Sequence, residues 1–130
     1  MSRASGSKLG FPRSDRLLRR VDFLRVQREG RRVHTPHFVV MVMPAERQRL
    51  GVTVTRRTAG SVGRNRIKRL AREVFRQNRG LFPARCEFVL VARAGAYQLD
   101  YAALRTELFE ARASLARAAA MSPLPHETRS

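Results

Sequence analysis

The chain has 130 residues, and 27 lysine and arginine residues against 10 aspartate and glutamate residues give it a formal net charge of +17. This charge sets the chain apart from ordinary soluble proteins and makes a polyanion, above all a nucleic acid, the expected partner. Because Cys86 is the single cysteine, an intramolecular disulfide and a cysteine-rich zinc site are both excluded. No apolar run resembles a signal peptide or is long enough to span a membrane, which predicts a cytoplasmic protein without a membrane partner.

The length fits one domain, so we expect a single RNA-binding domain over residues 1–130 with its core over about 11–119.

The N-terminal part is predicted to begin with a basic arm, which a helix follows. Residues 1–10 are rich in Ser, Gly, Arg and Lys without a period, which predicts a disordered arm. A helix is predicted from Ser14, capped by Ser14 or Asp15, with Gly30 just past its end. Its core-facing residues follow helical spacing: Leu17, Val21 and Leu24.

Two other apolar residues of this helix lie off that stripe. Phe23 and Val26 fall on a side shared with Arg16, Arg19 and Arg20. An aromatic residue among arginines is typical of a stacking platform for an unpaired base, which contributes about 1–3 kcal/mol per base. The same pattern fits a helix wedged between two packing partners, with Phe23 in the core. The sequence leaves both interpretations open.

Two apolar runs predict an antiparallel hairpin. "HFVVMVM", residues 37–43, has no polar alternation, as in a strand buried on both faces, whereas "RLGVTVTR", residues 49–56, alternates apolar residues with Gly and Thr. Residues 44–48 supply the turn between them. The preceding "RRVH", residues 31–34, is a candidate for one more short strand.

A strongly amphipathic helix is predicted from Ser61, its cap, to near Asn78. At about 100° per residue, one stripe is apolar and suited to pack on a sheet: Ile67, Leu70, Ala71, Val74 and Phe75. The opposite face is polar and basic: Asn65, Lys68, Arg69, Arg72, Arg76 and Arg79. Cations in the first turns lie at the positive end of the helix macrodipole, and each one destabilises the helix by roughly 0.3–1 kcal/mol when exposed. The basic face is therefore predicted to track a nucleic-acid backbone.

The C-terminal part contains a strand and a last helix. "CEFVLVAR", residues 86–93, is the predicted strand, and the helix is predicted over residues 100–120 with Asp100 as its cap. Its core-facing residues are Tyr101, Leu104, Leu108, Ala111 and Leu115. The tail over residues 121–130 contains two prolines and is predicted to be disordered. The order αβββαβα predicts an α/β (α+β) two-layer sandwich, with a small mixed four-stranded sheet and three helices.

The sequence predicts neither catalytic nor metal-binding residues. Its three histidines, His34, His37 and His126, show no metal-ligand spacing with Cys86 or with the acidic residues. A two-metal nuclease needs several carboxylates together, and no such group stands among the ten acidic residues.

The central helix and its flanking strands carry a resemblance to a known family. "RNRIKRLAREVFR", residues 64–76, preceded by "LGVTVTRR" and followed by "EFVLVAR", closely resembles the bacterial ribonuclease P protein component, whose hallmark is an Arg-Asn-Arg helix. The segments "FPRSDRLLRRVDFLRV", "GRRV", "FVVMV" and "ARAGA" fit as well. The resemblance runs from about Phe11 to Ala116, nearly the whole chain.

This resemblance implies a subunit without protein catalysis, in an enzyme whose RNA removes the 5′ leader of precursor tRNA with Mg²⁺ bound mainly by that RNA. The implied partners are the ribonuclease P RNA, in a 1:1 complex, and precursor tRNA. The residues implied to bind the catalytic RNA are Arg56, Arg57, Arg64, Asn65, Arg66, Lys68, Arg69, Arg72 and Arg76. Those implied to bind the leader are Arg19, Phe23, Val39 and Met41. The family also implies a left-handed βαβ crossover, against the right-handed rule that holds in about 98% of cases.

A function of another class remains as the alternative. A ribosomal or nucleoid structural protein would use the same basic helix to bind RNA or DNA without any processing role. Its affinity would be indifferent to a 5′ leader. A helix-turn-helix regulator fits less well, because no short helix and tight turn precede the basic helix at the required spacing.

Overall fold

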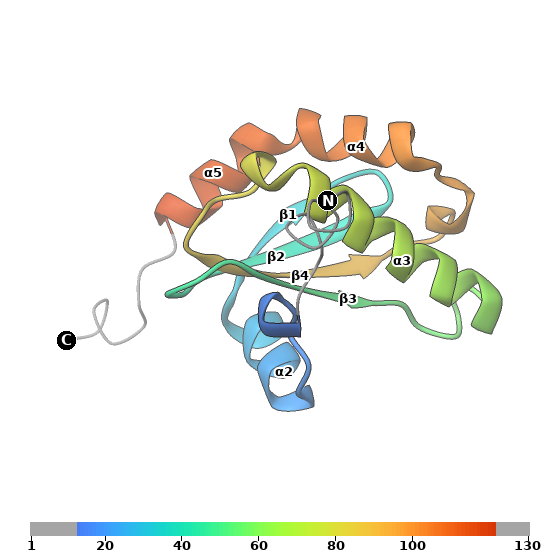
Figure 1. Ribbon diagram of the computed structural model, residues 1–130, viewed down its shortest axis with the longest axis horizontal. Helices are drawn as coiled ribbons and strands as arrows, with labels where there is room; N and C mark the ends of the chain where they lie inside the picture. Colours follow the sequence, from blue (N-terminus) through green and yellow to red (C-terminus); the bar gives the residue numbers. More distant parts are fainter. Residues whose placement is uncertain (1–12, 122–130) are drawn as a thin grey trace, which may run out of the picture.

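A four-stranded mixed sheet lies at the centre of the computed structural model, which describes residues 13–121 (Figure 1). The strands are β1 (Arg31–His34), β2 (Phe38–Pro44), β3 (Arg49–Thr53) and β4 (Cys86–Ala92). The α-helices are α2 (Arg20–Glu29), α3 (Ser61–Gln77), α4 (Tyr101–Glu110) and α5 (Arg112–Met121). Short 3₁₀ turns are η1 (Arg13–Asp15), η2 (Arg79–Leu81) and η3 (Ala96–Gln98). The arm predicted over 1–10 lies outside the described residues, as does the tail predicted over 121–130 apart from Met121 at the end of α5.

The strand order β1-β2-β4-β3 shows that the predicted hairpin is wrong. β4 lies between β2 and β3, antiparallel to β2 and parallel to β3, with Val40 opposite Leu90 and Leu50 opposite Phe88. Because β4 is apolar and buried along almost its whole length, it takes a central position that covers both its faces and both its edges. The short strand predicted over residues 31–34 is confirmed as β1, which pairs with β2 in antiparallel orientation.

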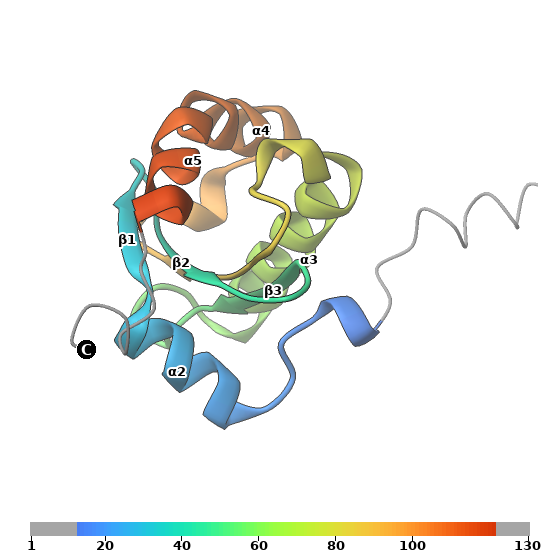
Figure 2. The same cartoon turned by 90° about the vertical axis from the view of Figure 1, so that its left-hand side faces the viewer.

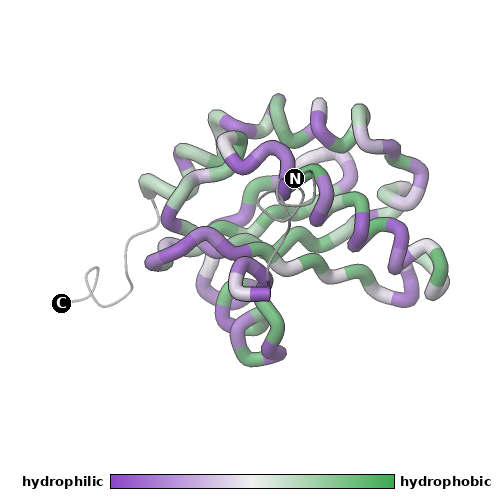
Figure 3. Tube along the Cα trace, viewed as in Figure 1, coloured by the Kyte–Doolittle hydropathy of each residue, from purple (hydrophilic) through white to green (hydrophobic). Residues whose placement is uncertain are grey.

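Helices cover both faces of the sheet, so the predicted two-layer arrangement with three helices is corrected to a sheet between two helical layers (Figures 1 and 2). The larger core, with α3, α4 and α5, includes Val40 and Phe88. α2 packs on the opposite face, against Met41 and Val89. Figure 3 shows the hydrophobic colouring of the central strands. Since successive side chains of a strand point to opposite faces, strands that are apolar throughout give the sheet two cores.

α2 begins at Arg20 and not at Ser14 as predicted. The chain before it is extended along the edge of the sheet. The Leu17 N–H donates to the Leu50 carbonyl at 3.0 Å, and Arg16 forms a parallel bridge with Leu50. The polar and basic residues ahead of α2 therefore run beside β3 and come close to α3.

The later start reverses the face of α2 that packs on the sheet. Val21 and Leu24, predicted to face the core, are 58% and 40% exposed, whereas Val26 is fully buried. Phe23 packs with Val26 in the cluster under α2. Gly51 on β3 makes room for this ring, because a Cβ there would lie 2.6 Å from the Phe23 Cε2 atom. The predicted stripe failed because Leu17 belongs to the extended segment and does not fix the phase of the helix.

α3 has the predicted length and the predicted apolar stripe. Ile67, Ala71, Val74 and Phe75 are buried against the sheet and α4, and Leu70 packs beside them. Its N-cap is Gly60 and not Ser61, and glycine has no side chain to cap the first turn. The first N–H groups of α3 are therefore not capped by the N-cap residue, and such uncapped N–H groups can bind an anion or water.

The predicted C-terminal helix is divided at Ala111 into α4 and α5. The Asp100 cap is confirmed, since its Oδ1 accepts from the Ala103 N–H at 2.8 Å. Leu104, Leu108 and Leu115 are fully buried, as the spacing predicts. Among the described helices, none is both long and apolar enough to cross a bilayer.

Candidate nucleic-acid interface

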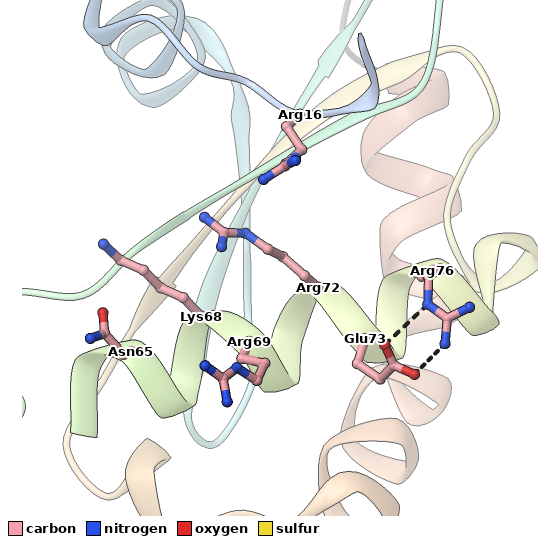
Figure 4. Close-up of a pocket in the computed structure, with 7 residues that line it drawn as sticks. All are labelled: Arg16, Asn65, Lys68, Arg69, Arg72, Glu73 and Arg76. Atoms are coloured by element: carbon pink, nitrogen blue, oxygen red, sulfur yellow. Dashed lines mark hydrogen bonds and ion pairs between the residues drawn. The ribbon is translucent and has the colours of Figure 1, made fainter. Parts of the chain in front are cut away.

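The polar face of α3 forms one wall of an open groove (Figure 4). The groove is lined by five basic residues, an amide and an acid: Arg16, Lys68, Arg69, Arg72, Arg76, Asn65 and Glu73. All except Arg16 come from α3, where spacings of three and four residues place them on one face. The structure thus brings together five of the six residues predicted for the basic face, and Arg79 is not part of the lining.

Arg16 reaches the groove from the extended segment before α2. Its side chain and that of Arg72 point toward each other (Figure 4). The pKa of Arg72 lies below its ordinary value, first because the side chain is partly buried and second because of the positive charge of Arg16. Two cations that converge in this way repel each other, and an anion between them would relieve the repulsion. Sequence reasoning missed this role of Arg16, because the pairing of its segment with β3 leaves no local pattern.

Asp15 fixes the segment that carries Arg16. Its carboxylate accepts a hydrogen bond from Arg79 Nη2 at 2.7 Å and one from Arg47 Nη2 at 3.1 Å. Arg79 follows α3, and Arg47 lies in the connection between β2 and β3. Arg79 also lies over the Phe75 ring, 4.9 Å from its centroid. Asp15 therefore connects its own segment to the chain after α3 and to the connection between β2 and β3. Its ion pair with Arg79 accounts for the position of Arg79 outside the groove.

The one acid in the groove is neutralised within α3. Arg76 Nε donates to Glu73 Oε1 at 3.0 Å, and Gln77 Nε2 donates to Glu73 Oε2 at 2.9 Å. The hydrogen bond from Arg76 holds the pKa of Glu73 below its ordinary value and raises the pKa of Arg76. Since this pair lies toward the C-terminal end of α3, the remaining positive charge concentrates around Lys68 and Arg72.

The two arginines of the Arg-Asn-Arg motif do not line the groove, because their side chains donate hydrogen bonds to backbone carbonyls elsewhere. Arg64 Nη1 donates to the carbonyl of Ala59 at 3.1 Å. Arg66 donates from Nε to the Tyr97 carbonyl at 3.3 Å and from Nη2 to the Leu99 carbonyl at 2.7 Å. A guanidinium has five N–H donors, so these contacts leave donors on both side chains for a further ligand.

The other two arginines predicted to bind RNA precede α3. Arg56 and Arg57 lie exposed in the turn between β3 and α3. This turn precedes α3 by a few residues, and neither arginine belongs to the lining of the groove.

The residues predicted to bind the leader share the sheet face under α2. Phe23, Val39 and Met41 belong to one apolar cluster. Met41 is only 7% exposed, whereas Phe23 and Val39 are half-buried. Arg19 is exposed at the N-cap of α2, with its Nε 3.6 Å from Asp22 Oδ2. Phe23 is therefore a packing residue, as one of the two interpretations predicted, and it is half-buried. Base stacking on Phe23 stays a prediction.

The burial of two carboxylates could not be predicted from the sequence, because their partners lie in distant segments of the chain. Glu87 accepts from Arg49 Nε at 2.9 Å and from Arg25 Nη2 at 3.1 Å, which connects α2 to β3 and β4. Glu107 accepts from the His37 N–H at 2.7 Å, which connects α4 to the turn before β2. Within residues 13–121, no group of three or more His, Cys, Asp or Glu side chains is placed to hold a metal ion.

Comparison with known proteins gives a consistent result. The ribonuclease P family model matches residues 11–116. The ribonuclease P protein component of Desulfovibrio desulfuricans is 42% identical to this chain, covering 82% of this chain and 87% of the relative. The ribonuclease P protein component of Geotalea uraniireducens is 38% identical, and the match covers 78% of this chain and 90% of that relative.

Solved structures are similar in fold as well as in sequence. The RNase P protein of Staphylococcus aureus superposes with a TM-score of 0.68 at 26% identity, covering 80% of this chain and 96% of that one. The RNase P protein of Thermotoga maritima superposes with a TM-score of 0.67 at 31% identity, and the match covers 78% of this chain and 96% of that one.

Proposed function

The chain belongs to the bacterial ribonuclease P protein family, and on that premise we propose that the groove along α3 binds the phosphate backbone of the ribonuclease P RNA. A member of this family is the protein subunit of the endoribonuclease that removes the 5′ leader of precursor tRNA. The observation that carries the proposal is the convergence of Arg16 and Arg72 in a groove that also holds Lys68 and Arg69. A phosphate placed there would bind both guanidinium groups and remove their mutual repulsion.

The mechanism that follows is electrostatic and positional. Each phosphate neutralised by Lys or Arg releases condensed counterions, so the groove gains affinity where RNA strands crowd their charges together. The backbone contacts fix orientation and leave base sequence unread. The residues proposed to contact this RNA are Arg16, Arg56, Arg57, Arg64, Asn65, Arg66, Lys68, Arg69, Arg72 and Arg76.

The 5′ leader has a different surface available. We propose that it lies on the sheet face beside α2, where the half-buried side chains of Phe23 and Val39 pack beside the buried Met41. Arg19 at the start of α2 would contact a leader phosphate. Bases of a single strand stack on the face of an aromatic ring such as Phe23 without regard to sequence, so this surface suits leaders of varied composition.

Mg²⁺ is the metal that the family implies, and we assign it to the RNA subunit. The groove does not fit a protein-bound divalent cation, because its one carboxylate, Glu73, is held by Arg76 and five basic side chains share the lining. The protein residues act by holding RNA phosphates and take no part in a proton transfer.

Other features of the family extend the proposal. We propose one RNA-binding domain that associates 1:1 with the RNA in the cytoplasm, where precursor tRNA is made. We also propose that the connection from β3 through α3 to β4 is left-handed. The parallel pairing of β3 with β4 requires a crossover connection, and what supports its left hand is the likeness to solved proteins of the family.

The test is cleavage of a 5′-labelled precursor tRNA by bacterial ribonuclease P RNA at low Mg²⁺, where that RNA alone is slow. Added protein should increase the rate of cleavage at the mature 5′ end. Affinity for precursor tRNA should fall on Phe23→Leu, while affinity for mature tRNA should stay unchanged. Tight RNA binding without any increase in rate would instead favour a structural RNA-binding protein.

A further inference from the structure

Tyr97 is an exposed aromatic residue on a firmly anchored turn. It lies in η3 and is 46% exposed, while Ala96 and Leu99 beside it are 1% and 8% exposed. Gly95 precedes the turn with a φ of 87°, a left-handed conformation that glycine adopts without strain. The buried neighbours hold the backbone in place, so the Tyr97 side chain is presented to solvent from a fixed position.

Arg66 and Gly63 place this turn against the first turns of α3. The guanidinium of Arg66 donates to the carbonyls of Tyr97 and Leu99. Gly63 lies nearby, since a Cβ there would be 3.9 Å from the Tyr97 Cβ. That Cβ would also lie 2.9 Å from the Ala59 Cβ, so glycine at this position permits the close approach of Ala59. A residue of the RNA-binding motif thus fixes an aromatic side chain beside α3.

The faces of the Tyr97 ring are unoccupied by any ring or cation within residues 13–121. Its hydroxyl accepts a hydrogen bond from Gln98 Nε2 at 3.3 Å. Phe109 on α4, which is 39% exposed, differs in this respect. Arg112 lies over that ring at 3.8 Å and Arg105 at 5.9 Å from its centroid. Of the two aromatic side chains that are exposed in the described part of the chain, Tyr97 is therefore the one that has no cation or second ring over it.

The ring borders the proposed RNA surface. At about 100° per residue, Val62 and Arg66 lie on α3 between the basic face, centred on Asn65, and Gly63, which faces Tyr97. Val62 is 82% exposed, so a second apolar side chain lies along this edge. A part of the RNA that contacts Arg66 and passes Val62 would come within reach of the Tyr97 ring.

We propose that Tyr97 stacks on an unpaired base of the ribonuclease P RNA, and that Arg66 is the positioning residue that holds Tyr97 in place. This inference rests on the proposed function. Proteins recognise RNA most often at unpaired bases that stack on aromatic side chains, and a free ring at the edge of a basic surface is suited to that contact. The catalytic RNA is the partner chosen because Tyr97 lies beside α3, whereas the surface proposed for the leader lies under α2.

The first experiment measures the Kd of the protein for the ribonuclease P RNA at fixed Mg²⁺ and salt. Tyr97→Ala and Tyr97→Leu should raise Kd roughly 5- to 150-fold, the loss expected when one stacked base is deprived of its aromatic partner. Tyr97→Phe keeps the ring and should bind like the wild type. Phe109→Ala, an exposed aromatic residue away from α3, is the matched control and should leave Kd unchanged.

The positioning role of Arg66 is tested by a double-mutant cycle. If Arg66 acts partly by holding Tyr97, the loss in Arg66→Ala combined with Tyr97→Ala should be smaller than the product of the two single losses. Strictly multiplicative losses would overturn that role. Thermal unfolding of each variant, followed by circular dichroism, shows that the comparison is made between folded proteins.

A photo-cross-linking residue at position 97 then identifies the contact within the holoenzyme. Cross-linking to an unpaired nucleotide of the ribonuclease P RNA supports the proposal, whereas cross-linking to paired RNA or to the precursor tRNA overturns it. Wild-type Kd in Tyr97→Ala, or an equal loss in Tyr97→Phe, also overturns it. In each of these cases the wild-type protein still accelerates processing at low Mg²⁺, so a failure of the stacking proposal is distinguishable from a failure of the proposed function.

Discussion

The carboxylate of Asp15 accepts a hydrogen bond from the guanidinium of Arg79 at 2.7 Å, which fastens the segment before α2 to the chain just after α3. Arg16 follows Asp15 directly and faces Arg72 in the groove. Asp15 therefore restrains the segment that places Arg16 opposite Arg72, although the two cations repel each other. The ion pair that provides this restraint lies outside the groove.

Asp15→Asn should weaken both this restraint and the binding of RNA. The partly buried pairs with Arg79 and Arg47 would lose their charge, with a fall in unfolding free energy of about 1 kcal/mol. Arg16 would then be less well placed, and Kd for the ribonuclease P RNA should rise a few-fold. Urea unfolding and filter binding measure the two effects. Asp22→Asn, which removes looser ion pairs at 3.6 Å, should leave the RNA affinity intact.

Arg16→Gln and Arg72→Gln each remove one of the two converging cations. Arg72→Gln removes a partly buried cation that Arg16 repels, so this variant of the free protein should be as stable as the wild type or more stable. Each of the two substitutions should weaken RNA binding and lower the slope of log Kd against log salt by about 0.7–0.9 for every phosphate that the variant no longer neutralises. A salt titration of Kd is the measurement. Arg117→Gln on α5 is the control, and a wild-type slope in both groove variants would contradict the binding of phosphate by these two arginines.

Gly51→Ala should destabilise the protein through Phe23. The added methyl group would lie 2.6 Å from the ring and 3.2 Å from the Leu17 Cβ, which predicts a loss of about 1–3 kcal/mol in unfolding free energy. In the Phe23→Ala background the ring is gone, so the same substitution should cost much less. Chemical denaturation of the four proteins completes the cycle. Gly80→Ala, where a Cβ meets nothing within 4 Å, is the matched control, and equal losses in both backgrounds would refute the close approach of Gly51 and Phe23.

Glu73→Gln should remove a contribution to stability that disappears in acid. The hydrogen bond from Arg76 lowers the pKa of Glu73 from its ordinary value of 4.5, so the folded protein favours the charged form. This stabilisation is complete above pH 4.5 and is lost as the pH falls through the lowered pKa of the folded protein. Thermal unfolding at pH 7 and pH 3 should show a difference between wild type and variant that shrinks in acid. Glu110→Gln on α4 is the control.

The features that the sequence determined by itself lie within single elements. The period of α3 separates its apolar stripe from its basic face, and burial of Ile67 and Phe75 confirms that separation. The Asp100 cap and the strands over residues 31–34 and 86–92 were likewise predictable, because capping and apolar runs depend on neighbours along the chain. The family assignment came from the same helix, whose Arg-Asn-Arg motif is contiguous.

Tertiary structure decided everything that depends on contacts between distant segments. β4 separates β2 from β3 because its apolar residues need cover on both faces and both edges, a requirement that no turn sequence reveals. The pairing of Leu17 with Leu50 delays α2 and turns Phe23 toward Gly51. The same extended segment carries Arg16 to Arg72. A local period records which face of an element is apolar, whereas long-range burial and pairing select the partner that covers it.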